Sequence, residues 1–189
     1  MKDPRRIPPG QVFTEKFPVL TYGVTPKFDP KTWTFRLFGE VEQPVQLSYW
    51  DLMALPKTVE TADFHCVTTW SRLDNHWEGV GIQEVMKLVE VRPSAHFVMA
   101  HCDGGYTTNL SLTALLDEDV LLAYRHDGKD LTPDHGWPLR LIVPKLYAWK
   151  SAKWLRGLEF MGDDKPGFWE THGYHSEADP WREQRFLNE

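Results

Sequence analysis

The chain has 189 residues, of which 41% are hydrophobic and 25% are charged, and its net charge is −6. This composition is typical of an ordinary soluble domain, and the length predicts one domain, over residues 1–189, that needs no disulfide to fold. The net negative charge and the lack of long Lys/Arg runs exclude nucleic acid as the main partner. No apolar run reaches the length of a membrane span.

Residues 1–31 are broken by prolines and predict an irregular N-terminal arm. The twin arginine Arg5-Arg6 is not followed by an apolar stretch, because Pro8 and Pro9 stand where a signal core would begin. We therefore expect a cytoplasmic protein, whose two cysteines are free thiols.

The rest of the chain shows strand and helix patterns in irregular order. In 32–41, for example, large apolar residues alternate with polar ones, and Ser48 with Asp51 three positions later is typical of a helix start. Predicted strands cover 32–41, 59–67, 96–102, 120–126, 139–143 and 153–161. Predicted helices cover 48–55, 81–91 and 110–119, with a hairpin turn at 126–129 and a surface-wrapping tail over 162–189. This mixture predicts an α+β fold with mixed β-sheets and short helices.

Two short motifs have ordinary structural explanations. Gly79-Val80-Gly81 lacks the third glycine of a dinucleotide loop, and we predict no strand before it, so a turn before a helix is favoured. The pairs His65-Cys66 and His101-Cys102 are compatible with zinc ligands or a Cys-His nucleophile pair. Neighbouring residues on a strand point to opposite faces, so each pair offers only one ligand to a site. A small buried thiol is the favoured local interpretation of each cysteine.

The stretch HGWPLRLIVPKLYAWKSAKW (135–154) places cations inside apolar sequence. On a strand over 139–143, Arg140 shares a face with Ile142, while Leu139, Leu141 and Val143 take the other face. Arg140 then lies among buried positions and needs an anion such as phosphate or carboxylate. A solvated edge strand with salt bridges is the equal alternative.

Taken together, DFHCVTTWSRLDNHWEGV (63–80) and HGWPLRLIVPKLYAWKSAKWL (135–155) resemble the molybdopterin-binding domain of the sulfite oxidase family, and most of all its short, haem-free members. The likeness extends from FPVLTYG to PGFWETHGYH. It implies the sulfite-oxidase-type fold and a cofactor of molybdenum with molybdopterin that carries no appended nucleotide. It also implies two-electron oxygen-atom transfer on a small substrate.

The resemblance implies a role for individual residues. Cys66 matches the cysteine that ligates molybdenum, and Arg140 matches the arginine on the cofactor phosphate. The remaining cofactor-binding positions that it implies are Thr21, Tyr22, Gly23, His65, His101, His135, Ser151, Ala152 and Lys153. An external electron carrier is implied as well, since no haem or flavin motif is visible.

One departure from the family concerns the substrate. Sulfite oxidase has an arginine-rich stretch after its cysteine that helps to bind an oxyanion, whereas here only Arg72 is basic. A neutral substrate, such as a sulfoxide or an N-oxide, suits Thr68, Thr69 and Trp70 better than sulfite does. Two alternatives stay open: a molybdopterin-binding or carrier protein without turnover, and a zinc or thiol hydrolase. The oligomeric state is not predicted.

Overall fold

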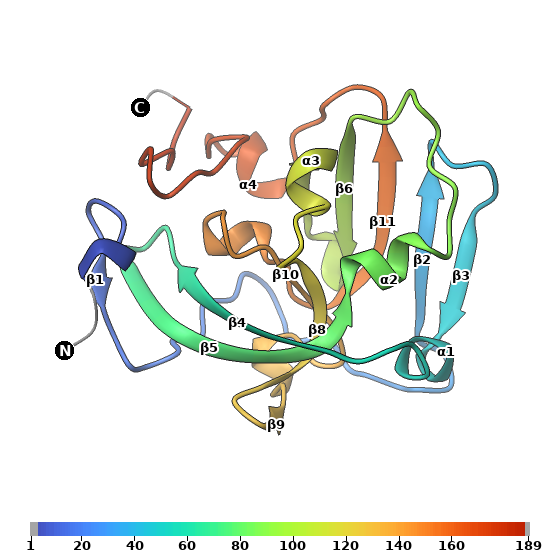
Figure 1. Cartoon of the computed structure of the whole chain (residues 1–189), viewed down its shortest axis with the longest axis horizontal. Coiled ribbons are helices and arrows are strands. Elements are labelled where there is room, and N and C mark those ends of the chain that lie inside the picture. The colour runs from blue at the N-terminus through green and yellow to red at the C-terminus, as the bar shows by residue number, and fades with distance from the viewer. Residues whose placement is uncertain (1–3, 188–189) are drawn as a thin grey trace.

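The computed structural model describes residues 4–187, and in it two mixed β-sheets are joined by short helices and long loops (Figure 1). We call the first the β5 sheet; it contains β1 (Val12–Phe13), β4 (Thr58–His65), β5 (Trp70–Gly81), β8 (Leu121–His126), β9 (Lys129–Asp130) and β10 (Arg140–Ile142). The second, the β11 sheet, contains β2 (Thr34–Gly39), β3 (Val45–Ser48), β6 (Phe97–Cys102), β7 (Thr107–Ser111) and β11 (Leu155–Met161).

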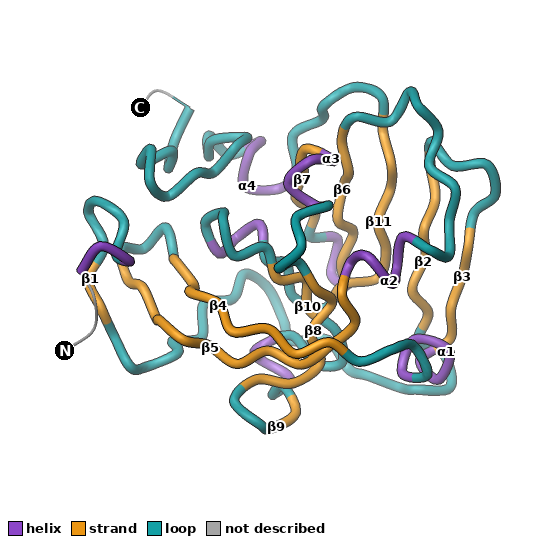
Figure 2. The backbone as a smooth tube through the Cα atoms, viewed as in Figure 1, coloured by secondary structure: helices purple, strands orange, loops and turns teal. Residues whose placement is uncertain are grey.

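The helices are short. They are α1 (Tyr49–Met53), α2 (Ile82–Met86), α3 (Leu112–Leu115), α4 (Phe168–Thr171) and the 3₁₀ turns η1 (Pro4–Arg6), η2 (Asp103–Gly105), η3 (Pro133–His135) and η4 (Ala148–Lys150). Among the described residues, no helix is long and apolar enough to cross a membrane. Loops therefore make up much of the region between the two sheets (Figure 2).

Strand pairing in both sheets mixes parallel and antiparallel neighbours. In the β5 sheet, β5 pairs antiparallel with β4 and β8 and parallel with β1. In the β11 sheet, the order is β3-β2-β11-β6-β7, and β11 pairs parallel with β2 and antiparallel with β6. The predicted α+β fold with mixed sheets is confirmed.

Two local predictions are confirmed in atomic detail. Helix α1 begins at a capping box: the Ser48 hydroxyl accepts from the Asp51 backbone N–H at 3.2 Å, and the Asp51 carboxylate accepts from the Ser48 N–H at 2.9 Å. In the predicted turn at 126–129, Asp127 and Gly128 both have positive φ, as a tight hairpin turn requires.

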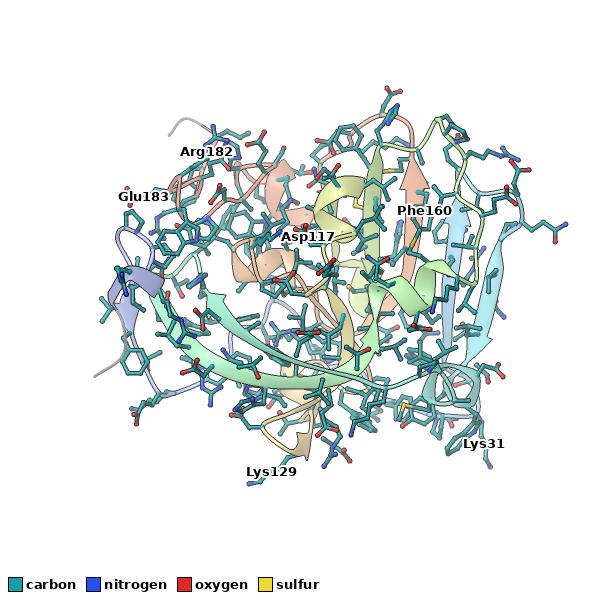
Figure 3. The ribbon with its side chains drawn as sticks, in the orientation of Figure 1. Lys31, Asp117, Lys129, Phe160, Arg182 and Glu183 are labelled. Atoms are coloured by element: carbon teal, nitrogen blue, oxygen red, sulfur yellow. The ribbon has the colours of Figure 1, made fainter. Side chains whose placement is uncertain are left out.

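The predicted two faces of β10 are also confirmed, and they divide the core. Leu139, Leu141 and Val143 belong to the large hydrophobic cluster that packs against the β11 sheet. Ile142 belongs to a second cluster built around Phe64, Trp77 and other residues of the β5 sheet. Side chains like Phe160 of β11 lie inside the protein, whereas Lys129 points outward from its hairpin (Figure 3).

The chain after η4 returns alongside β10, and this return positions the cations. The Leu141 N–H donates to the Ala152 carbonyl at 2.9 Å, and the Leu155 N–H donates to the Leu139 carbonyl at 2.9 Å. Arg140 and Lys153 consequently stand opposite one another in an antiparallel bridge. Two residues thirteen positions apart in sequence are thereby brought side by side.

Two predictions of local structure around Gly81 were wrong. The helix expected over 81–91 ends at Met86, and Val91, which was expected in the same helix, forms a β-bridge with Val41 instead. The strand β5, which precedes Gly81, was missed. Its buried positions include the polar Ser71 and Asn75 beside Leu73 and Trp77, so the hydrophobic alternation is hidden.

The two ends of the chain are more ordered than predicted. Residues 1–3 and 188–189 of the predicted arm and tail lie outside the described residues. The arm contains η1 and β1, and β1 pairs with the start of β5 through Val12↔Trp70. The tail contains α4 and a bridge between Tyr174 and Phe186. Both ends lie on the same side of the molecule, beside the β4–β5 hairpin (Figure 1).

The close approach of β5 to β8 gives a test of this packing. A Cβ atom on Gly79 would lie 2.1 Å from the Leu122 carbonyl oxygen, whereas one on Gly81 would meet the Thr58 hydroxyl at 2.9 Å. We expect Gly79→Ala to lower the free energy of unfolding by about 3 kcal/mol or more, because backbone cannot move aside as a side chain can. Denaturant unfolding measures the effect, with Gly81→Ala as the matched control. Equal losses in the two variants would contradict this packing.

Candidate functional site

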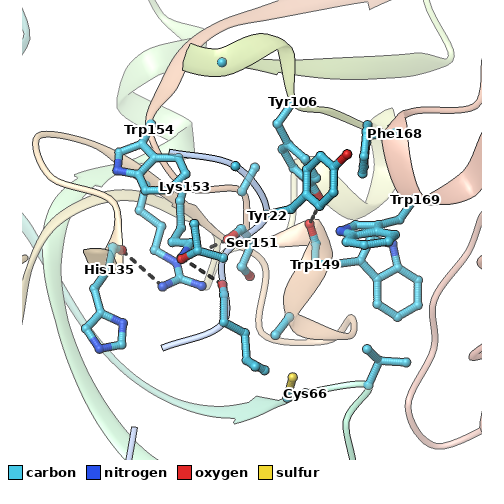
Figure 4. A pocket seen from close by; sticks show the side chains of 18 of the residues that line it. Tyr22, Cys66, Tyr106, His135, Trp149, Ser151, Lys153, Trp154, Phe168 and Trp169 are labelled. Atoms are coloured by element: carbon cyan, nitrogen blue, oxygen red, sulfur yellow. Dashed lines mark hydrogen bonds between the residues drawn. The ribbon is translucent and has the colours of Figure 1, made fainter. Parts of the chain in front are cut away.

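A cavity of about 450 Å³ opens between the β4–β5 hairpin, the N-terminal arm, the segment around η4 and the tail helix α4 (Figure 4). Its lining residues come from distant parts of the chain: Phe17, Pro18, 20–24, Phe64, 66–68, Trp70, 103–106, His135, Arg140, Ala148, Trp149, 151–154, Phe168, Trp169 and Tyr174. Ligand cavities in proteins have volumes of this order.

Cys66 lies at the end of β4, where the chain turns into β5. The turn is closed by hydrogen bonds from the Cys66 N–H to the Trp70 carbonyl at 2.8 Å and from the Thr69 N–H to the Cys66 carbonyl at 3.0 Å. The sulfur is 3.1 Å from the Thr68 hydroxyl. Burial raises the pKa of the Cys66 thiol, while the Thr68 hydrogen bonds and the Arg140 charge oppose that rise.

Arg140 is a buried cation on β10. Its Nε donates to the Ser151 carbonyl and its Nη1 to the His135 carbonyl, both at 3.2 Å, and the guanidinium lies 5.0 Å from the Phe64 ring centre. Burial lowers the pKa of Arg140 to about 10. Within residues 4–187, no carboxylate forms an ion pair with it. At neutral pH the cavity therefore contains a positive charge that no carboxylate of the described residues neutralises.

Lys153 adds a second cation beside Arg140. Its ammonium group donates to the carbonyls of Leu20 and Asp134, both at 2.8 Å, and to Thr21 Oγ1 at 2.5 Å. Burial and the charge of Arg140 lower the pKa of Lys153 to about 8. These hydrogen bonds hold the loop that carries Thr21 against the cavity.

The predicted segment Thr21–Gly23 does line the cavity. Tyr22 is 68% exposed, and its ring packs against Phe168 of α4 with ring centres 4.8 Å apart. Gly23 has φ +85°, a conformation that favours glycine. The N-terminal arm and the C-terminal tail therefore meet over the cavity mouth.

His135 also lines the cavity and stacks on Phe17, with ring centres 4.3 Å apart and planes 5° from parallel. Burial, followed by the charges of Arg140 and Lys153, lowers the pKa of His135 to about 4. The imidazole is consequently neutral at pH 7, with one donor and one acceptor nitrogen. Such a ring suits an uncharged polar partner.

Ser151 and Ala152, which directly precede Lys153 in the sequence, are buried and also line the cavity. The Ser151 hydroxyl accepts from the Val143 N–H at 2.9 Å, and the Ser151 carbonyl accepts from Arg140. The small side chains leave the backbone of this segment accessible from the cavity.

Two predicted residues do not join the others. His65 points to the opposite face of the strand from Cys66, and its Nδ1 lies 2.8 Å from the Ser71 hydroxyl. His101 lies on the β11 sheet, where its Nε2 is 2.8 Å from the Glu159 carboxylate. Neither residue lines the cavity.

The structure also separates the two His-Cys pairs. Cys102 is buried in the large core cluster, where burial raises the pKa of its thiol far above the usual range. Among residues 4–187, no group of three or more His, Cys, Asp or Glu residues is arranged to hold a metal. A zinc site built by protein side chains alone has no support within that part of the chain.

An aromatic wall faces Cys66 across from the cations, and sequence reasoning found only part of it. The wall consists of Tyr106, Trp149, Phe168, Trp169 and Tyr174, and the sequence motifs do not identify Trp149, Phe168 or Tyr174 as lining residues. The local sequence does not identify these three residues as lining residues, because an aromatic residue in a loop or short helix can equally well pack in the hydrophobic core.

A buried ion pair fixes this wall. The Lys150 ammonium donates to Glu170 Oε1 at 2.6 Å and to the Asn109 carbonyl at 2.7 Å. Trp149 Nε1 donates to the same Glu170 oxygen at 2.8 Å, and the Thr108 hydroxyl donates to it at 2.8 Å. Both charged side chains are at most 1% exposed. The pair ties η4 and α4 to β7, and so holds the aromatic rings of both segments.

Arg72, the basic residue after the cysteine, is not in the cavity. Its guanidinium contacts Asn75, Asp127 and His126, and its Nε donates to the Glu15 carbonyl at 3.2 Å. The positive charges among the described lining residues are therefore those of Arg140 and Lys153, with His135 neutral.

Comparison with known proteins gives a consistent result. A relative from Bacillus subtilis (strain 168), "Uncharacterized oxidoreductase YuiH", is 48% identical over 182 residues, which cover 96% of this chain and 92% of the relative. The protein-methionine-sulfoxide reductase catalytic subunit MsrP of Campylobacter jejuni is 26% identical over 175 residues, covering 81% of this chain and 59% of that protein.

The fold has a solved counterpart. The sulfane dehydrogenase SoxCD from Paracoccus pantotrophus superimposes with a TM-score of 0.66 at 22% identity, over 74% of this chain and 40% of that one. The sulfite-oxidase-type fold expected from the two motifs is thereby confirmed. The family model described as "Oxidoreductase molybdopterin binding domain" matches residues 22–169. The chain therefore belongs to this sulfite-oxidase-like family of oxidoreductases, whose cofactor is molybdenum bound to molybdopterin.

Proposed function

We propose that this chain catalyses two-electron oxygen-atom transfer on a small neutral substrate, such as a sulfoxide or an N-oxide, at molybdenum ligated by Cys66. When bound, the molybdenum cofactor supplies the two-electron redox chemistry, and the protein residues bind, orient and shield the reactants. Electrons are proposed to come from a separate carrier protein. The cytoplasmic location and the single domain remain predictions.

One observation carries the proposal: Arg140 is buried in a ligand-sized cavity without a carboxylate partner in the described chain. A buried charge is costly unless it is paired. A phosphate group pairs well with a guanidinium fork and a neighbouring ammonium, and Lys153 supplies the latter. The phosphorylated pterin therefore fits the cation side of the cavity.

The remaining lining residues fit the other parts of the cofactor. His135 is neutral and offers a donor and an acceptor to the polar pterin ring. Ser151 and Ala152 allow close approach to the backbone, and Thr21–Gly23 covers the opening. The soft Cys66 thiolate suits a metal that already has sulfur ligands, and metal binding deprotonates the thiol in spite of burial. His65 and His101 are not part of the proposed site.

The walls favour a neutral substrate over an oxyanion. Once Arg140 and Lys153 hold a phosphate, the lining described here keeps no further Lys or Arg for sulfite or nitrate. Trp70, Trp149 and Trp169 offer apolar surface to a substituent on sulfur or nitrogen, and they restrict the entry of water. The Thr68 hydroxyl, 3.1 Å from the sulfur of Cys66, is placed to donate a hydrogen bond to the thiolate.

Removal of the proposed metal ligand tests the site. We expect Cys66→Ala protein, purified from cells that make the cofactor, to contain less than about one tenth of the wild-type molybdenum, since thiolate ligation is lost. The matched control is Cys102→Ala, which removes the other buried thiol without touching the cavity. Metal analysis measures both variants. Wild-type molybdenum content and activity in Cys66→Ala would rule out this role for Cys66.

The low pKa of Lys153 predicts a pH dependence for cofactor retention. Lys153 is charged below its pKa of about 8, and a phosphate raises that pKa, so affinity falls as pH rises above about 8. We expect faster loss of the pterin at pH 9 than at pH 7, followed by fluorescence of the released oxidised pterin. Lys153→Arg keeps its charge over this range and removes the difference. The same pH effect in Lys153→Arg would contradict the assignment.

The substrate class and turnover are tested by one titration. The visible absorption of the molybdenum centre, which differs between its reduced and oxidised states, is followed while methyl phenyl sulfoxide or trimethylamine N-oxide is added to the reduced protein, or sulfite to the oxidised protein. We expect sulfoxide or N-oxide to reoxidise the metal, and sulfite to act on the oxidised protein at least tenfold less efficiently. Preference for sulfite would reject the neutral-substrate assignment, and a metal that no substrate reoxidises or reduces would favour a binding or carrier protein.

A further inference from the structure

Three segments that are far apart in sequence meet at the turn that carries Cys66. We call residues 66–69 the Cys66 turn. The N-terminal arm runs beside it, because the Val12 N–H donates to the Thr69 carbonyl at 2.8 Å. The C-terminal tail reaches it through Arg185. Both ends of the chain lie on this side of the molecule (Figure 1).

Gln11 of the arm holds one carbonyl of the turn. Its Nε2 donates to the Cys66 carbonyl at 3.0 Å, and its Oε1 accepts from the Ser71 hydroxyl at 3.5 Å. The Cys66 carbonyl also receives the Thr69 N–H at 3.0 Å. The Gln11 side chain thus connects Cys66, which bears the thiol, to the start of strand β5 at Ser71.

Arg185 of the tail holds the next carbonyl. Its Nη1 donates to the Val67 carbonyl at 2.8 Å, its Nη2 donates to the Pro9 carbonyl at 3.4 Å, and its guanidinium lies 5.0 Å from the Tyr147 ring centre. The side chain is only 12% exposed, so solvent competes little for these hydrogen bonds. A charged donor in such a place forms a stronger hydrogen bond than a neutral one.

The arm and the tail also touch one another at this point. Gly10 has φ +67°, and a Cβ atom there would lie 2.8 Å from Glu183 Oε1 and 2.9 Å from Arg185 Nη2. A glycine lets the arm pass close enough for Pro9 to accept from Arg185. The close contact between the arm and the tail therefore depends on a glycine at position 10.

We propose that Gln11 and Arg185 are positioning residues, which hold the carbonyl groups of Cys66 and Val67, one in each peptide unit beside the Val67 α-carbon, and so set the direction of the Cys66 sulfur in the cavity. The proposal rests on the proposed role of Cys66 as the metal ligand. Neither side chain lines the cavity, and both lie outside the residues 22–169 that match the family model. Groups that orient a metal ligand in this way affect metal affinity 10–100-fold.

The test compares Gln11→Ala and Arg185→Ala with wild type. Arg182→Ala is the matched control, because Arg182 belongs to the same tail but lies at the surface, 66% exposed, paired with Glu177 (Figure 3). Amide hydrogen exchange of residues 66–69 is measured in cofactor-free protein, and the Mo(V) EPR spectrum and the rate of molybdenum loss are measured in loaded protein. Circular dichroism and thermal unfolding confirm that each variant is folded.

We expect exchange in the Cys66 turn to rise roughly tenfold in Arg185→Ala and Gln11→Ala. The loaded variants should show a broadened or second Mo(V) species and lose molybdenum roughly tenfold faster, while Arg182→Ala resembles wild type. Arg185→Lys keeps the charge, but its single ammonium does not replace the guanidinium fork, so it should restore the spectrum only in part.

Unchanged exchange in both folded alanine variants would overturn the proposal. If amide exchange in the Cys66 turn is faster but the Mo(V) spectrum and the rate of molybdenum loss are unchanged, the turn does not set the direction of the Cys66 sulfur, and this part of the proposal is overturned. Should Arg185→Ala fail to fold, Gln11→Ala decides, since the backbone hydrogen bonds of the arm remain. Wild-type protein without molybdenum would refute the proposed function instead, while the exchange experiment would still show whether Gln11 and Arg185 hold the turn.

Discussion

The buried charge of Arg140 organises the site. Taking a guanidinium out of water is unfavourable, and in residues 4–187 no carboxylate offsets it; backbone carbonyls and the ring of Phe64 compensate in part. Its pKa of about 10 and that of Lys153, about 8, reflect this incomplete compensation. A bound dianion neutralises both cations at once. Under the proposed function, the phosphate of the cofactor supplies the negative charge that the described lining residues do not provide.

The surrounding architecture keeps these cations in place. Strand β10 buries Leu139 and Leu141 in the large core cluster, and this anchors Arg140 on its opposite face. The buried Lys150–Glu170 ion pair likewise holds the aromatic wall in place, because it fixes η4 and α4 against β7. Such a pair contributes little net stability, because desolvation opposes its attraction, but it specifies one arrangement of the segments it joins.

The thiol side of the cavity depends on the ends of the chain. Strand β1 adds to β5 directly after the turn that carries Cys66, and the tail closes back over the same turn through Arg185. Segments that look like irregular appendages in the sequence thus complete the site. Tyr22 of the arm and Phe168 of the tail, in ring contact, meet over its mouth.

The sequence by itself determined the α+β class, the capped start of α1 and the two faces of β10, since these follow from local periodicity. Its family motifs also named Cys66, Arg140 and Lys153, which the structure brings together in one cavity lining. Only the tertiary structure decided that β5 is a long strand, because its buried Asn75 is satisfied by partners that local sequence does not reveal. It also decided that His101 stands apart and that an aromatic wall faces the thiol. Side-chain direction and contacts between distant segments depend on packing, which periodicity alone does not encode.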